Sequence, residues 1–220
     1  GLPAGTGLGL TSTGTASADL TGTPTQVGSH VLTVTATDAS GCSGGRTYAF
    51  EITQGTQTIS FTSTAPADAT IGGAPYTVSA SATSGLAVAL SIDPAASAVC
   101  SLAGSSVTFQ GAGTCVINAN QAGDANYAPA PQVQQSFAVA LASQTITFTS
   151  TAPTDATVGG PSYTAAATAS SGLPVTLSID ASASTVCAIA GSVVSFQGAG
   201  TCVVNADQAG DATHAPAPRV

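Results

Sequence analysis

Short runs in which apolar and polar residues alternate follow one another between residues 57 and 139. In the run from Gln57 to Ser63, Ile59 and Phe61 alternate with Thr and Ser, which is the pattern of a half-buried β-strand. Later runs predict strands that turn the following side chains inward: Tyr76, Val78, Ala80 and Ala82; Val88, Leu90 and Ile92; Val107 and Phe109; Cys115 and Ile117; and Val133, Phe137 and Val139. With the run around Cys100 this makes about seven short strands separated by Gly- and Pro-rich turns, as in a β-sandwich. No run has the period of a helix, so we expect almost no helix.

The pattern occurs twice. The run Phe109–Val116 (FQGAGTCV) returns letter for letter at Phe196–Val203, and Gln57–Val133 aligns without a gap with Gln144–Val220. Self-similarity at one fixed spacing is typical of an array of modules. Each copy is close in size to an immunoglobulin-like domain, which is large enough to have a core of its own.

The chain therefore divides into three parts. Residues 54–141, the first repeat, are predicted to form one immunoglobulin-like module. Residues 142–220, the second repeat, are predicted to form another that lacks its last strand, because the QQSFAVAL of the first repeat has no counterpart there. Residues 1–53, the N-terminal segment, show strand patterns at His30–Thr37 and Arg46–Ile52. Only three or four strands are visible in this segment, too few for a closed sandwich, so we expect the C-terminal part of a further module whose front lies upstream.

The two joints between these parts have the same length. Phe50 and Ile59 are as far apart in the sequence as Phe137 and Ile146. The last strand of one part is expected to run almost directly into the first strand of the next, with a linker of about two or three residues, which favours a stiff connection. The predicted fold class is all-β, with tandem immunoglobulin-like β-sandwiches joined end to end.

Each repeat contains two cysteines at the same spacing, Cys100 with Cys115 and Cys187 with Cys202. A pair that recurs inside each module predicts one disulfide per module, and two reduced, buried cysteines are the alternative. A disulfide that closes about 15 residues stabilises a fold by roughly 3 kcal/mol if chain entropy dominates. Disulfides also indicate an oxidising compartment.

The disulfide constrains the topology, because Cys100 and Cys115 lie on the first and third of three successive strands. In a flat meander these strands would be about 9.5 Å apart, whereas the two Cα atoms of a disulfide lie within about 7 Å. The chain is therefore expected to cross to the other sheet between Phe109 and Cys115, at a Gly-Ala-Gly corner. Cys42, in the turn DASGCSGG, has no counterpart, and we expect its partner to lie outside this segment, upstream or on another chain.

The composition mainly excludes certain partners and structural classes. Lys and Arg total 2 and Asp and Glu total 10, for a formal net charge of -8. Two Arg residues cannot form a basic patch, so we expect no nucleic-acid partner. The hydrophobic content of 43% argues against disorder. No apolar run approaches the roughly 18 residues of a membrane helix, so we expect no membrane insertion in this segment.

Candidate chemistry is sparse. His30 and His214 fall in different modules and have no Cys or His companion at metal-ligand spacing, and no GxSxG motif occurs. We therefore predict no catalytic, cofactor-binding or metal site, no cofactor and no enzymatic activity. Tyr127, in GDANYAPA, is interpreted as packing under its own loop, with a surface contact as the alternative. Three pairs of Asp recur at strand ends and are interpreted as turn-stabilising, with Ca²⁺ at module joints as the alternative: Asp68 and Asp155, Asp93 and Asp180, Asp124 and Asp211.

The segments GLPAG and GTPTQVGSHVLTVTATDASGC closely resemble the immunoglobulin-like domains of long bacterial surface proteins. The pattern VCxxxGxxVxFxGAGTCV, followed by QAGDA and APA, resembles a second bacterial immunoglobulin-like repeat. Together the two resemblances cover essentially the whole chain, and they imply large secreted or surface-bound proteins such as adhesins and filaments. In the first family a Cys near the first strand accompanies the one that matches Cys42, which agrees with a partner outside the segment. No catalytic or ligand-binding residue is carried over.

These observations predict a structural shaft of an extracellular bacterial surface adhesin or filament, built from disulfide-stapled immunoglobulin-like modules. Its location would be extracellular or on the cell surface. The expected partners are other copies or neighbouring modules of the same protein. Strand exchange between neighbours is one way to complete the first and last modules, and the alternative is that their missing strands simply lie outside this segment. The alternative is a carbohydrate- or receptor-binding accessory module of a secreted protein, with host or surface glycans as partners.

Overall fold

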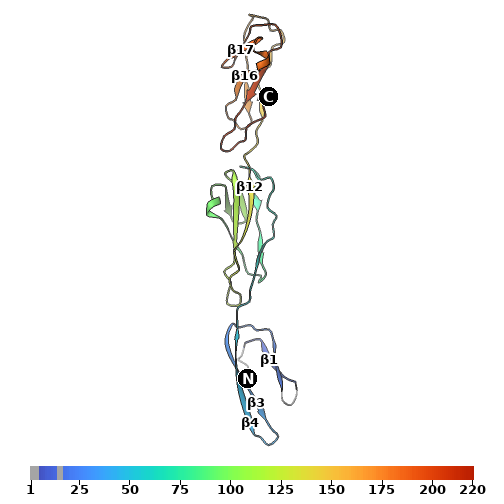
Figure 1. The fold of residues 1–220 in the computed structure, drawn as a ribbon, viewed down its shortest axis with the longest axis vertical. Helices are drawn as coiled ribbons and strands as arrows, with labels where there is room; N and C mark the ends of the chain where they lie inside the picture. The colour runs from blue at the N-terminus through green and yellow to red at the C-terminus, as the bar shows by residue number, and fades with distance from the viewer. Residues whose placement is uncertain (1–4, 14–16) are drawn as a thin grey trace. The chain divides into compact units, whose positions relative to one another are not determined.

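The computed structural model describes residues 5–13 and 17–220, whose regular secondary structure is almost wholly β-strand (Figure 1). Within these residues the helical elements are two short 3-10 helices, η1 (Pro94–Ala96) and η2 (Ala181–Ala183). Neither has the length or the apolar character that crossing a bilayer would require. The all-β fold class expected from the alternating pattern is confirmed.

The N-terminal segment contains two antiparallel hairpins. Their strands are β1 (Leu8–Ser12) with β2 (Ala18–Gly22), and β3 (Gly28–Thr37) with β4 (Ser43–Ile52). The second hairpin contains both strands expected from the sequence and extends each at its beginning. It buries Leu32, which is 5% exposed, whereas the neighbouring Val31 is 54% exposed. The segment therefore has one inward face and little core of its own.

The first repeat groups its strands into three small sheets. In pairing order they are β5 (Ile59–Phe61) and β7 (Ala80–Ala82); β6 (Tyr76–Thr77), β10 (Ser106–Phe109) and β9 (Cys100–Ala103); and β12 (Val133–Val139), β11 (Gly113–Asn120) and β8 (Ala89–Ile92). Cys115, Ile117 and Ala119 are each 0% exposed. Because successive side chains of a strand point to opposite faces, alternate residues of β11 form the centre of the core.

One predicted strand of the first repeat is wrong. The alternation from Tyr76 to Ala82 predicts a single strand, but β6 pairs with β10 whereas β7 pairs with β5. The break lies at Ser79, whose N–H donates to Ser63 Oγ at 2.9 Å and whose carbonyl accepts from the N–H of Thr62 at 2.8 Å. These bonds divert the backbone from one ladder to another, while Val78 stays buried at 1% exposure.

The second repeat copies this pairing. Its sheets are, in pairing order, β13 (Ile146–Phe148) and β15 (Ala167–Ala169); β14 (Tyr163–Thr164), β18 (Val193–Phe196) and β17 (Cys187–Ala190); and β16 (Thr176–Ile179) and β19 (Val204–Asp207). Even the register of the cysteine strands recurs, with Cys100 opposite Phe109 in the first repeat and Cys187 opposite Phe196 in the second. The same letters thus give the same ladders.

The second repeat departs from the first at β19. Strand β11 lies between β12 and β8, whereas β19 pairs with β16 in a two-stranded sheet. On its other side, among the described residues, Val220 exchanges two backbone hydrogen bonds with Ala206, at 2.8 and 3.2 Å. Val220 occupies the position that Val133, at the start of β12, has in the sequence alignment. Among the described residues, Ala206 is therefore the only residue of β19 with backbone hydrogen bonds to Val220 on this side.

Both predicted disulfides are present. Cys100 is bonded to Cys115 and Cys187 to Cys202, each with Cα atoms 5.7 Å apart. Because β9 and β11 belong to different sheets, the predicted crossing between Phe109 and Cys115 is confirmed. Each bond therefore links the two sides of a core, and two disulfides indicate an oxidising environment.

The Gly-Ala-Gly corner before each second cysteine needs both of its glycines. A Cβ atom at Gly111 would lie 2.5 Å from the carbonyl oxygen of Ala98, a contact too close for any side chain. Gly113 has a φ of 141°, and its counterpart Gly200 has a φ of 147°, which other residues rarely adopt. The repeated FQGAGTCV thus contains both the glycine turn at which the chain changes sheets and the cysteine whose disulfide fixes that turn.

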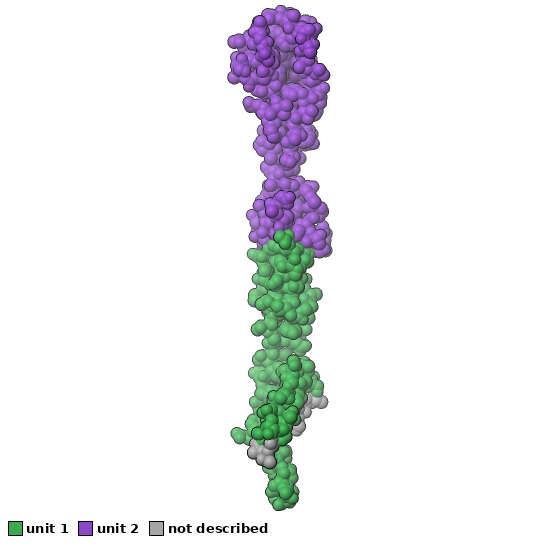
Figure 2. Space-filling view, turned by 90° about the vertical axis from the view of Figure 1, so that its right-hand side faces the viewer, with its two compact units in different colours: residues 1–64, 78–91, 117–135 green, residues 65–77, 92–116, 136–220 purple. Residues whose placement is uncertain are grey.

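The chain forms two compact units, coloured separately in Figure 2. The first contains residues 1–64, 78–91 and 117–135, and the second contains residues 65–77, 92–116 and 136–220. The N-terminal joint lies inside the first unit and the joint between the repeats inside the second. At these joints β4 is connected to β5 by residues 53–58, and β12 to β13 by residues 140–145. The connections are equal in length, as expected, but longer than the predicted two or three residues.

Candidate functional site

Each repeat holds its own lead-in segment through a loop that we call the joint loop. The joint loops are Gln121–Ala130 in the first repeat and Gln208–Ala217 in the second. In the first, the N–H of Gly55 donates to the carbonyl of Asn126 at 2.8 Å, and the N–H of Ala128 donates to the carbonyl of Gly55 at 2.9 Å. These bonds explain why the connection between strands is longer than predicted, because its middle residue pairs with the loop.

The joint of the second repeat has the same two bonds. The N–H of Ala142 donates to the carbonyl of Thr213, and the N–H of Ala215 donates to the carbonyl of Ala142, both at 2.9 Å. Ala142 therefore takes the place of Gly55. Since the pairing depends on backbone groups alone, it tolerates the change of side chain.

The side chain of a buried glutamine is hydrogen-bonded to each joint loop. Gln57 is 4% exposed, and its side-chain amide donates to Gln121 Oε1 at 2.6 Å and to the carbonyl of Ala128 at 2.7 Å. Its own Oε1 accepts from Ser84 Oγ at 2.5 Å. A buried amide with its donors and acceptors satisfied is rigid and costly to disturb. The second repeat repeats this network around Gln144, which is also 4% exposed.

The aspartate of each joint loop organises the turn itself. Asp124 Oδ1 accepts from the N–H groups of Asn126 and Tyr127 at 2.8 and 2.9 Å. Asp211 Oδ1 accepts from the N–H groups of Thr213 and His214 at 2.8 and 2.7 Å. In the second loop these bonds, with the Thr213 N–H first, lower the pKa of Asp211 to about 2.

A second pair of aspartates caps the 3-10 helices. Asp93 Oδ1 accepts from the N–H of Ala95, and Asp180 Oδ1 from that of Ser182, both at 3.0 Å. The Ser182 hydroxyl also donates to Asp180, at 2.6 Å, and these bonds lower the pKa of Asp180 to about 2. The turn-stabilising interpretation is confirmed for these four aspartates, whereas Asp68 and Asp155 are simply exposed. Within residues 5–13 and 17–220, no three His, Cys, Asp or Glu side chains gather as they would around a metal ion.

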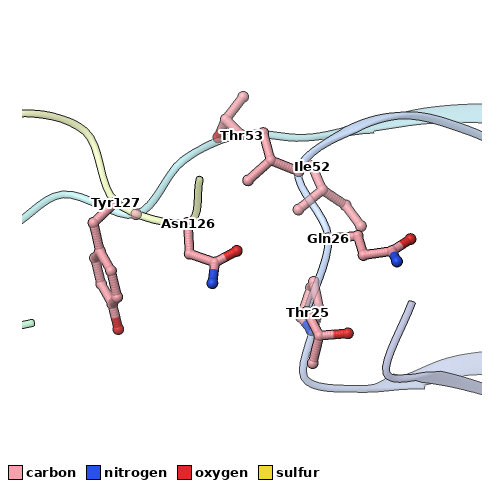
Figure 3. Close-up of a pocket in the computed structure, with 9 residues that line it drawn as sticks. Thr25, Gln26, Ile52, Thr53, Asn126 and Tyr127 are labelled. Carbon is pink, nitrogen blue, oxygen red and sulfur yellow. The ribbon is translucent and has the colours of Figure 1, made fainter. Parts of the chain in front are cut away.

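A cavity of about 380 Å³ lies beside the first joint loop (Figure 3). Residues from the turn before β3, the end of β4, the connection and the joint loop line it: Pro24, Thr25, Gln26, Val27, Ile52, Thr53, Gly55, Asn126 and Tyr127. None of these side chains carries a charge. Gln26, Asn126, Thr25 and Thr53 provide amide and hydroxyl groups, and the remaining lining is apolar or aromatic.

Tyr127 is half-buried and packs against Gly55. A Cβ atom at Gly55 would lie 3.2 Å from two carbons of the Tyr127 ring, so the absence of a side chain there makes room for the ring. The sequence interpretation placed Tyr127 under its own loop, whereas the structure places its ring against Gly55 of the connection and in the lining of the cavity. The sequence did not predict this cavity. The GTPT turn, whose Pro24 and Thr25 line one side of it, was noted only as part of a family resemblance.

A larger hollow of about 920 Å³ lies over the inward face of the N-terminal segment. Its lining comes from both hairpins and includes Leu10, Leu20 and Tyr48, which are 40%, 43% and 47% exposed. Among the described residues, no further strand covers these apolar side chains.

His30, His214 and Cys42, which the sequence also singled out, are not among the residues that line the cavity. His30 Nε2 lies 3.2 Å from the carbonyl oxygen of Gln26, and His214 Nδ1 lies 2.9 Å from Thr213 Oγ1. Cys42 is exposed in the β3–β4 turn and has no disulfide partner among the described residues. Its N–H donates to Asp38 Oδ1 at 2.9 Å, which holds the turn.

Comparison with known proteins adds no relative: the chain matches no protein-family model, and no curated protein matches it.

Proposed function

We propose that the chain is part of the structural shaft of an extracellular bacterial surface adhesin or filament, and that it is not an enzyme. The observation that carries this proposal is that the same stabilising features occur in both repeats. Both repeats have the same disulfide between sheets, the same glycine corner and the same backbone pairing of the lead-in segment. A protein that bears force and resists degradation benefits from these stabilising features in every module. Catalysis or ligand binding does not require them to be repeated.

In this proposal residues 54–141 and 142–220 are tandem immunoglobulin-like β-sandwiches, and residues 1–53 are the C-terminal part of another. Small antiparallel sheets, linked across a core by a disulfide, support this assignment. It also agrees with the sequence resemblance to bacterial immunoglobulin-like repeats. The equal connections at residues 53–58 and 140–145 support a regular, end-to-end array.

An extracellular or cell-surface location follows from the same parts. Disulfides persist in oxidising surroundings, where a protein also meets proteases. Trypsin cleaves after Lys and Arg, and the chain offers it only Arg46 and Arg219. Buried amide networks under the joint loops reduce local opening, which is the step that exposes a chain to cleavage.

In this proposal the edge of β19 beside Val220 is where a strand exchanged between neighbouring copies, or a later strand of the same chain, would pair. In the first repeat β12 covers the corresponding strand, and its Phe137 makes edge-on ring contacts with Tyr76 and Phe109, at centroid distances of 5.6 and 5.8 Å. In the second repeat the counterpart of Phe109, Phe196, is half-buried. A strand with the sequence of β12, donated by a neighbouring copy, would pair with β19 and cover Phe196.

Immunogold electron microscopy of whole and of thin-sectioned bacteria, with antibodies raised against the 220-residue chain, tests the proposal. Gold is expected along extended structures outside the cell, and the labelling should survive brief trypsin treatment. Antibody absorbed beforehand with the purified chain is the control. Gold confined to the cytoplasm, or spread over a soluble secreted fraction, would contradict a structural shaft.

A further inference from the structure

We propose that the cavity beside the first joint loop binds a neutral saccharide, with Tyr127 as the ring on which the sugar lies and Asn126 as its main hydrogen-bonding group. This inference goes beyond the structural role and does not depend on it, because it rests on the lining of one cavity. It would give the shaft a binding activity at the joint between the N-terminal segment and the first repeat.

The first argument is the comparison of the two joint loops. Gln121–Ala130 reads QAGDANYAPA and Gln208–Ala217 reads QAGDATHAPA, so the loops differ at two positions only. Those positions are Asn126 and Tyr127, which are also the two loop residues that line the cavity. The scaffold of the loop is kept while the surface that faces the cavity changes.

The second argument is that the turn does not need these two side chains. The N–H groups of Asn126 and Tyr127 bind the Asp124 carboxylate, and the carbonyl of Asn126 accepts from Gly55. The carbonyl of Tyr127 accepts from the N–H of Asp124 at 2.9 Å. All four groups are backbone atoms, and Thr213 and His214 make the same bonds in the second repeat. The backbone is thus fixed before any ligand arrives, which lowers the entropy cost of binding.

The third argument concerns charge and polarity. Since no lining side chain is charged, a charged ligand would lose hydration there without gaining an ionic partner. The carboxamides of Asn126 and Gln26 can each donate and accept hydrogen bonds. The Thr25 hydroxyl already donates to the carbonyl of Gly5 at 2.6 Å, so it is left to accept from a ligand hydroxyl. The lining therefore suits a neutral ligand that is dense in hydroxyl groups.

The fourth argument is the apolar part of the lining. The Tyr127 ring, Ile52 and Val27 offer surface to the C–H face of a sugar, and Figure 3 shows the Asn126 side chain projecting between the Tyr127 and Thr25 side chains. Hydroxyl groups combined with an apolar C–H face are characteristic of saccharides. The volume of about 380 Å³ falls at the lower end of the range for small-molecule sites, roughly 300–1,000 Å³, which suits one or two sugar rings.

The test is an NMR titration of the full 220-residue chain. The probes are glucose, galactose, mannose, N-acetylglucosamine and the disaccharides lactose, cellobiose and chitobiose, with sialic acid and glucuronic acid as anionic counterparts. At least one neutral sugar should shift the amide signals of residues 25–27, 52–55 and 126–127, with a dissociation constant on the order of 1 mM. The anionic sugars should bind at least roughly tenfold more weakly, which is a difference of about 1.4 kcal/mol.

The matched variant is the double substitution Asn126→Thr and Tyr127→His, which converts the first joint loop into the second and therefore preserves a loop known to fold. It should weaken binding by roughly tenfold or more, with the remaining amide signals unchanged. The control variant, Thr213→Asn with His214→Tyr, should leave binding at wild-type strength. The proposal is overturned if none of the neutral sugars shifts these signals, if the anionic sugars bind equally well, or if the first variant binds like the wild type.

Discussion

The first and second repeats have nearly the same sequence but present the strand after the disulfide corner in different surroundings. Strand β11 runs from Gly113 to Asn120 between two neighbours, whereas β19 covers only Val204–Asp207 and has β16 and a single pair of bonds from Val220. A strand's length is thus set by what lies beside it as well as by its own residues.

The cores differ in the same way. Phe109 is 6% exposed and Cys115 is 0% exposed, but their counterparts Phe196 and Cys202 are half-buried. The covering residue in the first repeat is Phe137 of β12, which contacts the Phe109 ring. Among the described residues, β12 accounts for this difference in burial between the two cores, and the following experiments break or sharpen that difference.

The largest effect is expected for Phe137→Ala. Removing a buried Phe side chain typically costs roughly 3–5 kcal/mol, so the first repeat should unfold far more readily while the second is unaffected. Amide hydrogen exchange in β11 and β19, measured in the same sample, reports on the two repeats separately. The variant Phe196→Ala should destabilise the second repeat by a smaller amount, because that side chain is half-buried. Equal losses of protection in β11 and β19 after Phe137→Ala would refute this account.

Removing a disulfide should affect either repeat by a similar amount. Both disulfides close the same length of chain, with a sequence separation of 15, so Cys100→Ser with Cys115→Ser should cost roughly 3 kcal/mol in the first repeat. The matching pair of substitutions at Cys187 and Cys202 should cost about the same in the second. Urea denaturation under oxidising conditions measures both. If removing the disulfide lowered the free energy of unfolding in only one repeat, the bond would stabilise mainly through contacts in the folded state. Restricting the unfolded chain would then be the smaller effect.

The rates of reduction should separate the two bonds. Cys202 is half-buried and Cys115 has no exposed surface, so a mild reductant should break the Cys187–Cys202 bond roughly tenfold faster. Mass spectrometry after timed alkylation measures each rate. A synthetic peptide VQQSFAVAL, which contains the sequence of β12 and the two residues after it, should slow reduction of the second bond only. A peptide with Ser in place of the Phe is the control, and equal protection by both peptides would argue against pairing beside β19.

The smallest effect is expected from acid. Hydrogen bonds from Ser182 hold the pKa of Asp180 at about 2, and bonds from Thr213 do the same for Asp211, below the value near 3.9 of an unfolded aspartate. Because the folded pKa is the lower one, this stabilisation is present above about pH 4 and is lost as the pH falls toward 2. NMR titration of the side-chain carboxyl carbons should give both pKa values. Thr213→Val should raise the pKa of Asp211 and leave that of Asp180 unchanged.

The sequence was sufficient for the periodic and repeated features. Alternation predicted the strands around Ile59, Phe109 and Ile117, and the cysteine spacing together with the sheet geometry predicted the crossing at the glycine corner. It failed between Tyr76 and Ala82, where the alternation is unbroken but the backbone bonds of Ser79 to Thr62 and Ser63 divide the strand. A strand break of this kind depends on hydrogen bonds to residues distant in the sequence, so no local pattern predicts it.

The candidate site shows the same boundary. The sequence identified Asp124 as a turn former and singled out Tyr127, but it contained no sign that Thr25, Gln26 and Asn126 would share a cavity. Alternation, repetition and cysteine spacing are properties of neighbouring or regularly spaced residues, and they determined the all-β class, the two matching repeats and their disulfides. Which strands share a sheet, which core is covered and which side chains line the joint depend on contacts between distant residues, and only the tertiary structure decided them.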